Sequence, residues 1–100
     1  MNILKINTSQ MGKVVVGLEG GGKNLELEKE QKFGSQVLLT MIEEILKIGR
    51  LKIEDLNEIR VETGPGSFTG IRVGVSVANA LGFSLGVPVN GKKIETEITY

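Results

Sequence analysis

Alternating hydrophobic and polar positions near the start of the chain predict three strands. Residues 23–29 alternate strictly between leucine and polar or charged side chains, a period of two that is typical of a half-buried strand. Residues 1–7 and 13–19 are rich in isoleucine and valine, which favour strands. Three consecutive glycines join the last two of these strands in chain order and favour a tight hairpin. We therefore expect an antiparallel meander whose other turn lies at residues 10–12.

The next apolar residues recur every three or four positions and predict a helix. They are Val37, Leu38, Met41, Ile42, Ile45 and Leu46. Ser35 can serve as the N-cap of this helix, and Gly49 is expected to stop it. Residues 51–57 then form a connector, with one helical turn near Ile53.

The second half of the chain predicts a strand, a second helix and two further strands. Residues 58–63 alternate as a strand does, and a glycine-rich loop leads from them into a helix that ends near Gly86. Residues 87–90 are expected to form a strand, Asn90-Gly91 a tight turn, and the alternating residues 94–100 a final strand.

Charged side chains on the predicted strands occupy the positions between the apolar ones. They are Lys5, Glu26, Glu28, Arg60, Glu62, Glu95 and Glu97. One face of the sheet is therefore expected to be solvated, and the helices to cover the other face. This pattern predicts a two-layer α/β domain with a mixed sheet and two main helices on one face.

The composition limits the chemistry that the chain can perform. One hundred residues suit a single domain, and twelve basic residues balance twelve acidic ones, so nothing favours direct binding of nucleic acid. The absence of cysteine and histidine excludes disulfides, thiolate metal sites and the commonest general base. We predict no catalytic residue and no metal site. We also expect no signal peptide and no apolar run able to span a membrane, and therefore a cytoplasmic protein.

The segment Gly64–Gly74, with the sequence GPGSFTGIRVG, is the most distinctive stretch of the chain. Its glycines permit close backbone approach, and Ser67 or Thr69 can cap the helix that follows. Free amides at the start of a helix can receive an anion. The alternative is a strand-to-helix turn that binds nothing, since glycine-rich turns are common.

Two stripes run along the second predicted helix. One consists of small residues four positions apart, and we expect it to pack on the protein's own sheet: Gly70, Gly74, Ala78, Gly82 and Gly86. The opposite stripe has mixed character: Arg72, Ser76, Asn79 and Phe83. On the first helix the outer positions are Leu39, Thr40, Glu43 and Lys47. These outer sides either face solvent, as single exposed apolar residues often do, or bind a partner.

The Gly64–Gly74 string resembles the signature of the TsaB (YeaZ) family of tRNA threonylcarbamoyladenosine biosynthesis proteins. Weaker similarity extends over residues 1–89. The resemblance implies an RNase-H-like domain of the actin-like ATPase superfamily. Family members have two such domains, and we expect residues 1–100 to form the first one alone, with the second absent. Two departures stand out: Asn7 replaces the family's usual aspartate, and Gly34-Ser35-Gln36 replaces its His-Ser-Glu.

For function, the resemblance implies a non-catalytic partner protein. Family members use the two helices to form a helical bundle, either with TsaD, the paralogue that transfers threonylcarbamoyl to adenosine in tRNA, or with a second copy. The residues assigned to partner binding are then Leu39, Thr40, Glu43, Arg72, Ser76, Asn79 and Phe83. Contact with tRNA is indirect, and ATP and magnesium act only through the partner.

Two other functions remain open at this point. The chain can be a small ATP-binding phosphotransferase or ATPase of the same superfamily, or a self-associating structural domain. In the ATP-binding case, the residues that receive an anion or nucleotide are Thr8, Ser9, Gly64, Gly66, Ser67, Thr69 and Gly70. The neutral amide of Asn7 makes this case weaker, because a carboxylate suits magnesium better.

Overall fold

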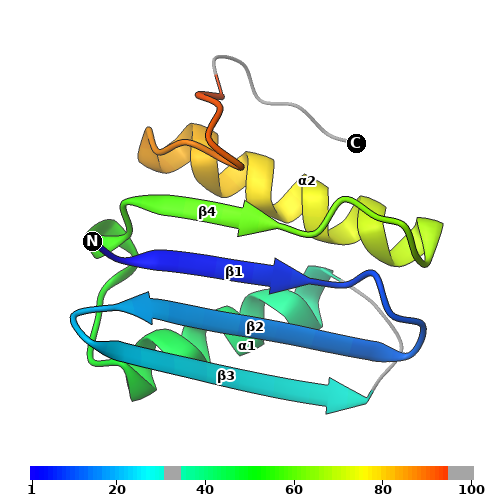
Figure 1. The fold of residues 1–100 in the computed structure, drawn as a ribbon, viewed down its shortest axis with the longest axis horizontal. Coiled ribbons are helices and arrows are strands. Elements are labelled where there is room, and N and C mark those ends of the chain that lie inside the picture. Colours follow the sequence, from blue (N-terminus) through cyan, green and yellow to red (C-terminus); the bar gives the residue numbers. More distant parts are fainter. Residues whose placement is uncertain (31–34, 95–100) are drawn as a thin grey trace.

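The computed structural model describes residues 1–30 and 35–94 and consists of a four-stranded sheet with two main helices (Figure 1). Its elements in chain order are β1 (Ile3–Asn7), β2 (Lys13–Gly20), β3 (Lys23–Glu30), α1 (Ser35–Ile48), the short 3-10 helix η1 (Ile53–Asp55), β4 (Glu58–Val61) and α2 (Phe68–Leu85). The strand order is β3-β2-β1-β4. The strand β1 is antiparallel to β2 and parallel to β4, so the sheet is mixed.

The strand register places the apolar side chains of neighbouring strands on one face. Leu4 of β1 lies between Leu18 of β2 and Ile59 of β4, and the same alternation continues along each strand. Both helices pack on this face, α1 against β2 and β3, and α2 against β4 and β1 (Figure 1). The fully buried core joins the two layers: Leu4, Ile6, Val14, Val16, Leu38, Met41, Ile42, Ile45 and Ile59. The predicted two-layer arrangement is confirmed.

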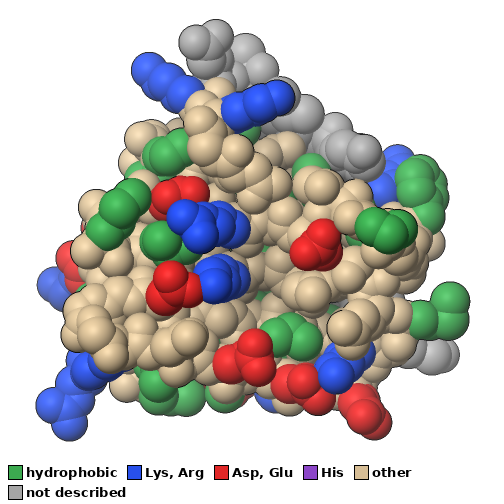
Figure 2. All heavy atoms as spheres, in the orientation of Figure 1, with side chains coloured by type: hydrophobic (Ala, Val, Ile, Leu, Met, Phe, Trp, Pro, Cys, Tyr) green, Lys and Arg blue, Asp and Glu red, His purple; other side chains and the backbone are tan. Residues whose placement is uncertain are grey.

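The other face of the sheet, called the open face here, carries charged side chains paired with one another. Lys5 binds Glu19, Lys13 lies 3.1 Å from Glu28, and the Nε atom of Arg60 lies 3.0 Å from Glu58. Figure 2 shows basic and acidic side chains side by side over this face. Its predicted solvation is confirmed for strands β1 to β4, whereas Glu95 and Glu97 lie outside the described residues.

Two of these ion pairs shift the ionisation of their members. The Lys5 ammonium, by a hydrogen bond and by its charge, holds the pKa of the Glu19 carboxylate below its usual value. The Glu58 carboxylate raises the pKa of the Arg60 guanidinium in the same way. Because Lys5, Glu19 and Arg60 are exposed to water, the pairs contribute little to stability and serve mainly to keep the face polar.

The helix ends follow local capping chemistry. The Ser67 hydroxyl accepts a hydrogen bond from the Gly70 amide at 3.3 Å, which makes Ser67 the N-cap of α2, as one of the two predicted candidates. Gly86 ends this helix with a φ of 68°. At the end of α1, Gly49 was the expected stop, but Arg50 is the residue in the left-handed conformation, with a φ of 57°. Gly49 is instead buried beneath Leu18 of β2, where a side chain has no room.

Some predicted strands differ from the observed ones. Residues 87–90 do not form a strand: Val89 makes an isolated parallel bridge to Ile59, because the chain turns away at Asn90, whose φ is 51°. The strand predicted over residues 58–63 ends at Val61, two residues earlier. Most of the strand predicted over residues 94–100 lies outside the described residues.

The expectation that no apolar run is long enough to span a membrane is wrong by length and composition alone, because Phe68–Leu85 meets both criteria. In this structure the segment is α2, and seven of its 18 residues are buried. Its apolar character is accounted for by packing on β4 and β1, as in the core helix of a globular domain.

Candidate functional site

The glycine-rich loop between β4 and α2 is tied to the turn that follows β1. The Ser67 amide donates to the Ser9 carbonyl oxygen at 2.6 Å, and the Thr8 hydroxyl donates to the Gly70 carbonyl oxygen at 2.5 Å. Thr8 is completely buried, and Ser9 nearly so. Two segments far apart in the sequence therefore form one unit at the carboxyl ends of two parallel strands.

Two glycines let these segments approach each other so closely. A Cβ atom on Gly66 would collide with the Ser9 carbonyl, and one on Gly74 would collide with the Thr8 hydroxyl. Both glycines are therefore explained by packing within the chain. Gly66 lets the backbone of the loop contact the backbone of Ser9, and this role does not depend on whether the loop binds a ligand.

Asn7 organises the turn after β1. Its side-chain oxygen accepts hydrogen bonds from the Ser9 amide at 3.0 Å and from the Ser9 hydroxyl at 2.6 Å. The structure thus brings together the predicted residues Thr8, Ser9, Ser67 and Gly70, and the three hydroxyls among them make hydrogen bonds within the chain. Thr69 is exposed beside them, and Gly64 is half-buried. Anion or nucleotide binding at this unit stays a prediction.

The outer sides of the two helices lie on the surface away from the sheet. Both helices begin at the end of the sheet where β1, β3 and β4 finish, and they contact each other (Figure 1). Leu39 of α1 is 43% exposed and Phe83 of α2 is 42% exposed. The other predicted partner-binding residues are exposed or half-buried along the same helices: Thr40, Glu43, Arg72, Ser76 and Asn79.

Phe68 extends this outer stripe and was missed from the sequence. It is the first residue of α2 and is 68% exposed, and the Arg72 guanidinium carbon lies 5.3 Å from the centre of its ring. This distance is within the range of a cation–π contact. The four-residue spacing from Phe68 to Arg72 was a usable signal once Ser67 is taken as the N-cap. We call Phe68, Arg72, Ser76, Asn79 and Phe83 the outer stripe of α2.

The small-residue stripe packs inward, as predicted. Gly70, Gly74, Ala78 and Gly82 are all buried, whereas Gly86 is the exposed C-cap. A Cβ atom on Gly82 would collide with Val89, so this glycine lets the helix pass close to the segment that covers β4. The two stripes therefore have separate roles, one inside the domain and one on its surface.

Comparison with known proteins identifies a matching family model, relatives in sequence and a solved structure of the same fold. A family model described as "TsaD: tRNA N6-adenosine threonylcarbamoyltransferase" matches residues 28–91. The Escherichia coli (strain K12) protein named tRNA threonylcarbamoyladenosine biosynthesis protein TsaB is 32% identical over 91 residues, which are 91% of this chain and 39% of that protein. The solved structure of YeaZ from Pseudomonas aeruginosa aligns with a TM-score of 0.82 at 29% identity, covering 88% of this chain and 41% of that one.

The chain belongs to the TsaB/YeaZ family. It corresponds to the N-terminal portion of family members and spans about two fifths of the length of the curated relatives that it matches. Its mixed four-stranded sheet with two helices matches the N-terminal domain of YeaZ, which has an actin-like ATPase fold. The resemblance inferred from the Gly64–Gly74 string is therefore confirmed.

The transferases of the same pathway are also similar to this chain. A tRNA N6-adenosine threonylcarbamoyltransferase from Tropheryma whipplei (strain Twist) is 45% identical over 56 residues, which are 56% of this chain and 14% of that enzyme. TsaB proteins and these transferases therefore share a segment of this kind.

Proposed function

We propose that this chain is a cytoplasmic, non-catalytic partner protein for a TsaD-like enzyme that transfers threonylcarbamoyl to adenosine in tRNA. The outer sides of α1 and α2 bind the enzyme, tRNA contact is indirect, and ATP and magnesium belong to the partner. Residues 1–100 act as a single TsaB-like N-terminal domain. The observation that carries the proposal is the exposure of Leu39 and Phe83 on the helix pair of a TsaB-family domain.

The physical basis is burial of apolar surface on two adjacent helices. Leu39, Phe68 and Phe83 lose their contact with water when a second pair of helices packs on the first. Burying the exposed part of each side chain contributes on the order of 1 kcal/mol. Arg72, the sole charged residue of α2, then favours an acidic group on the partner.

The similarity to the transferases supports this choice of partner. The TsaD family model matches residues 28–91, a range that contains both helices of this chain. A TsaD-like enzyme is therefore expected to present a similar helix pair, and two similar pairs can meet about an approximate twofold axis. The result is a four-helix bundle between the two proteins.

Self-association is a second candidate, favoured by the order of residues on the outer stripe of α2. If two copies of this helix pack antiparallel, with their midpoint between Val75 and Ser76, Phe68 of one copy lies opposite Phe83 of the other. Arg72 then lies opposite Asn79, so the two arginines do not face each other. The stripe is therefore compatible with a second copy in the same register.

Size-exclusion chromatography of the chain mixed with a TsaD-like transferase from the same organism tests the proposal. The two proteins should elute together at micromolar concentrations. Leu39→Glu should weaken the complex about tenfold or more, because it places a charge in the interface core. Met11→Glu is the matched control, since Met11 is 88% exposed on the β1–β2 turn and does not belong to either helix. Separate elution of the unaltered proteins would show that the proposal is wrong.

A further inference from the structure

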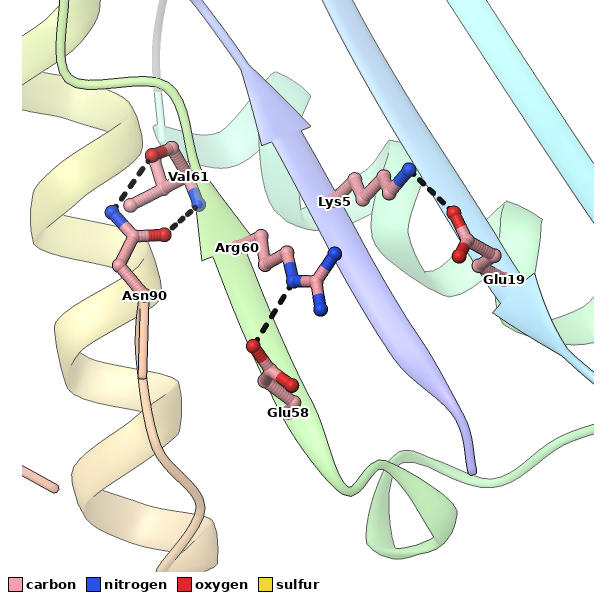
Figure 3. A network of polar contacts seen from close by, with 6 residues as sticks. All are labelled: Lys5, Glu19, Glu58, Arg60, Val61 and Asn90. Atoms are coloured by element: carbon pink, nitrogen blue, oxygen red, sulfur yellow. Dashed lines mark hydrogen bonds and ion pairs between the residues drawn. The ribbon is translucent and has the colours of Figure 1, made fainter. Parts of the chain in front are cut away.

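The side chain of Asn90 closes the free edge of β4. Its amide nitrogen donates to the Val61 carbonyl oxygen at 3.0 Å, and its amide oxygen accepts from the Val61 amide at 2.8 Å (Figure 3). One side chain thus satisfies both backbone groups of the last residue of the strand. We call this pair of hydrogen bonds the Asn90 clasp.

The clasp extends a short run of backbone pairing. The Ile59 amide donates to the Pro88 carbonyl at 3.0 Å, and the Asn90 amide donates to the Ile59 carbonyl at 2.9 Å. One step further along β4 the backbone of the covering segment has already turned away, through positive φ angles at Asn90 and Gly91. The Asn90 carboxamide replaces the missing peptide group there, since it carries the same donor and acceptor.

The same residue stands in the sequence context that is chemically most reactive for asparagine. The chain has six asparagines, at positions 2, 7, 24, 57, 79 and 90, and Asn90 is the one followed by glycine. Gly91 has no side chain to hinder its own amide nitrogen. Once deprotonated, this nitrogen attacks the Asn90 side-chain carbonyl carbon, a C–N bond forms, and ammonia leaves. Water then opens the cyclic imide at either carbonyl and yields aspartate or isoaspartate.

We propose that Asn90 is a deamidation site and that the clasp controls its reactivity. While both atoms of the carboxamide are bound to Val61, the side chain points across to β4 and away from its own backbone (Figure 3). The carboxamide must leave Val61 before its carbon meets the Gly91 nitrogen. Asn90 is exposed, so water and base reach it as soon as the clasp opens. Reaction at this site therefore reports local opening of the β4 edge.

Deamidation removes the clasp permanently. It replaces the donating NH2 group by a carboxylate oxygen, so two acceptor oxygens face each other at the Val61 carbonyl, and an unpaired acceptor remains. It also adds a negative charge beside the Val61 backbone, which the acidic residue Glu62 follows in the chain. Isoaspartate further lengthens the backbone inside the turn. Val61 ends β4 three residues before the first glycine of the glycine-rich loop, so the lesion loosens the strand end from which that loop leads to α2.

Peptide mapping by mass spectrometry of the full chain, aged in mildly alkaline buffer, tests the chemistry. Deamidation to aspartate or isoaspartate should occur mainly at Asn90, and the other five asparagines serve as internal controls. It should run about tenfold or more faster in denaturing urea than in native buffer, because the folded protein must first open the clasp. Equal deamidation rates in urea and in native buffer would show that the clasp does not control the reaction. No conversion at Asn90 in urea would overturn the site itself.

Amide hydrogen exchange, followed by NMR, tests the clasp separately from the reaction. Asn90→Gly keeps the turn, since glycine adopts the positive φ, but removes the carboxamide. The Val61 amide should then exchange about tenfold faster, because it has lost its acceptor. The Ile59 amide, which is bound to the Pro88 carbonyl, is the matched control and should keep its rate. Unchanged protection of Val61 would show that the clasp does not hold this edge.

Discussion

At the scale of single residues, the close approach of α2 to the sheet depends on Gly74. The Thr8 hydroxyl occupies the space that a side chain at this position would need, and Val61 and Ile6 lie just beyond it. Thr8 is completely buried and holds the Gly70 carbonyl one turn earlier on the helix. The Thr8 hydroxyl, in the turn directly after β1, and the missing side chain of Gly74 on α2 therefore fix the position of the helix together.

Gly74→Ala should destabilise the protein by about 1–3 kcal/mol, because the added methyl group overpacks the contact with Thr8. The sign of this change is informative, because replacing glycine by alanine at an exposed helix position normally stabilises a protein by about 1 kcal/mol. Urea denaturation measures the change. Ser84→Ala, at an exposed position of the same helix, is the control and should change the free energy of unfolding by less than about 0.5 kcal/mol. A Gly74→Ala variant as stable as its parent would contradict the close contact.

At the scale of elements, the end of α1 shows how packing overrides local preference. A left-handed residue at the end of a helix is usually glycine, and Gly49 was the natural candidate. Gly49 instead lets the end of the helix pack closely against Leu18, and Arg50 is the residue that adopts the left-handed conformation. The Leu51 amide then bonds to the Leu46 carbonyl at 2.9 Å and closes the helix end.

Arg50→Gly should therefore stabilise the protein by about 0.5–1 kcal/mol, because glycine adopts a positive φ without strain. Thermal unfolding followed by circular dichroism measures the effect. Arg50→Lys, which keeps a side chain in the same conformation, should leave the unfolding midpoint unchanged. If Arg50→Gly lowered the midpoint, the Arg50 side chain would have to make contacts that outweigh the backbone strain.

The sequence predicted the elements whose pattern is local. The alternation in residues 23–29 and the helical spacing from Val37 to Leu46 each identified an element of the structure. It did not predict features that depend on distant segments. The tight turn at Asn90-Gly91 was predicted, but not that residues 87–90 would pair with β4 only through the bridge from Val89 to Ile59, and the role of Gly49 is set by Leu18 of another element. Such contacts have no signal in spacing along the chain.

The candidate site was predictable to a similar degree. The outer positions Leu39 and Phe83 followed from helical spacing, and both are exposed in the structure. Phe68 was missed because it stands at the boundary between loop and helix, where its direction depends on which residue caps the helix. The hydrogen bonds of Thr8 and Ser9 to Gly70 and Ser67 were also not predictable, since they join the turn after β1 to the start of α2, and 62 positions separate Thr8 from Gly70.

At the scale of the whole molecule, the two faces differ in kind. The open face pairs its own charges, as in Lys5 with Glu19 and Arg60 with Glu58. The helix side instead exposes four large apolar residues on α1 and α2: Leu39, Ile48, Phe68 and Phe83. A face that already satisfies its charges gains little from a protein partner, whereas exposed apolar side chains on adjacent helices gain from burial. We therefore expect the helix side to bind the partner.

Calorimetric titration of the TsaD-like transferase with two surface variants tests this expectation most directly. Phe83→Glu changes the outer stripe of α2, and Glu26→Lys reverses an exposed charge on the open face. Phe83→Glu should weaken binding about tenfold or more, and Glu26→Lys should leave the affinity unchanged. Loss of affinity with Glu26→Lys, together with normal binding by Phe83→Glu, would contradict the account.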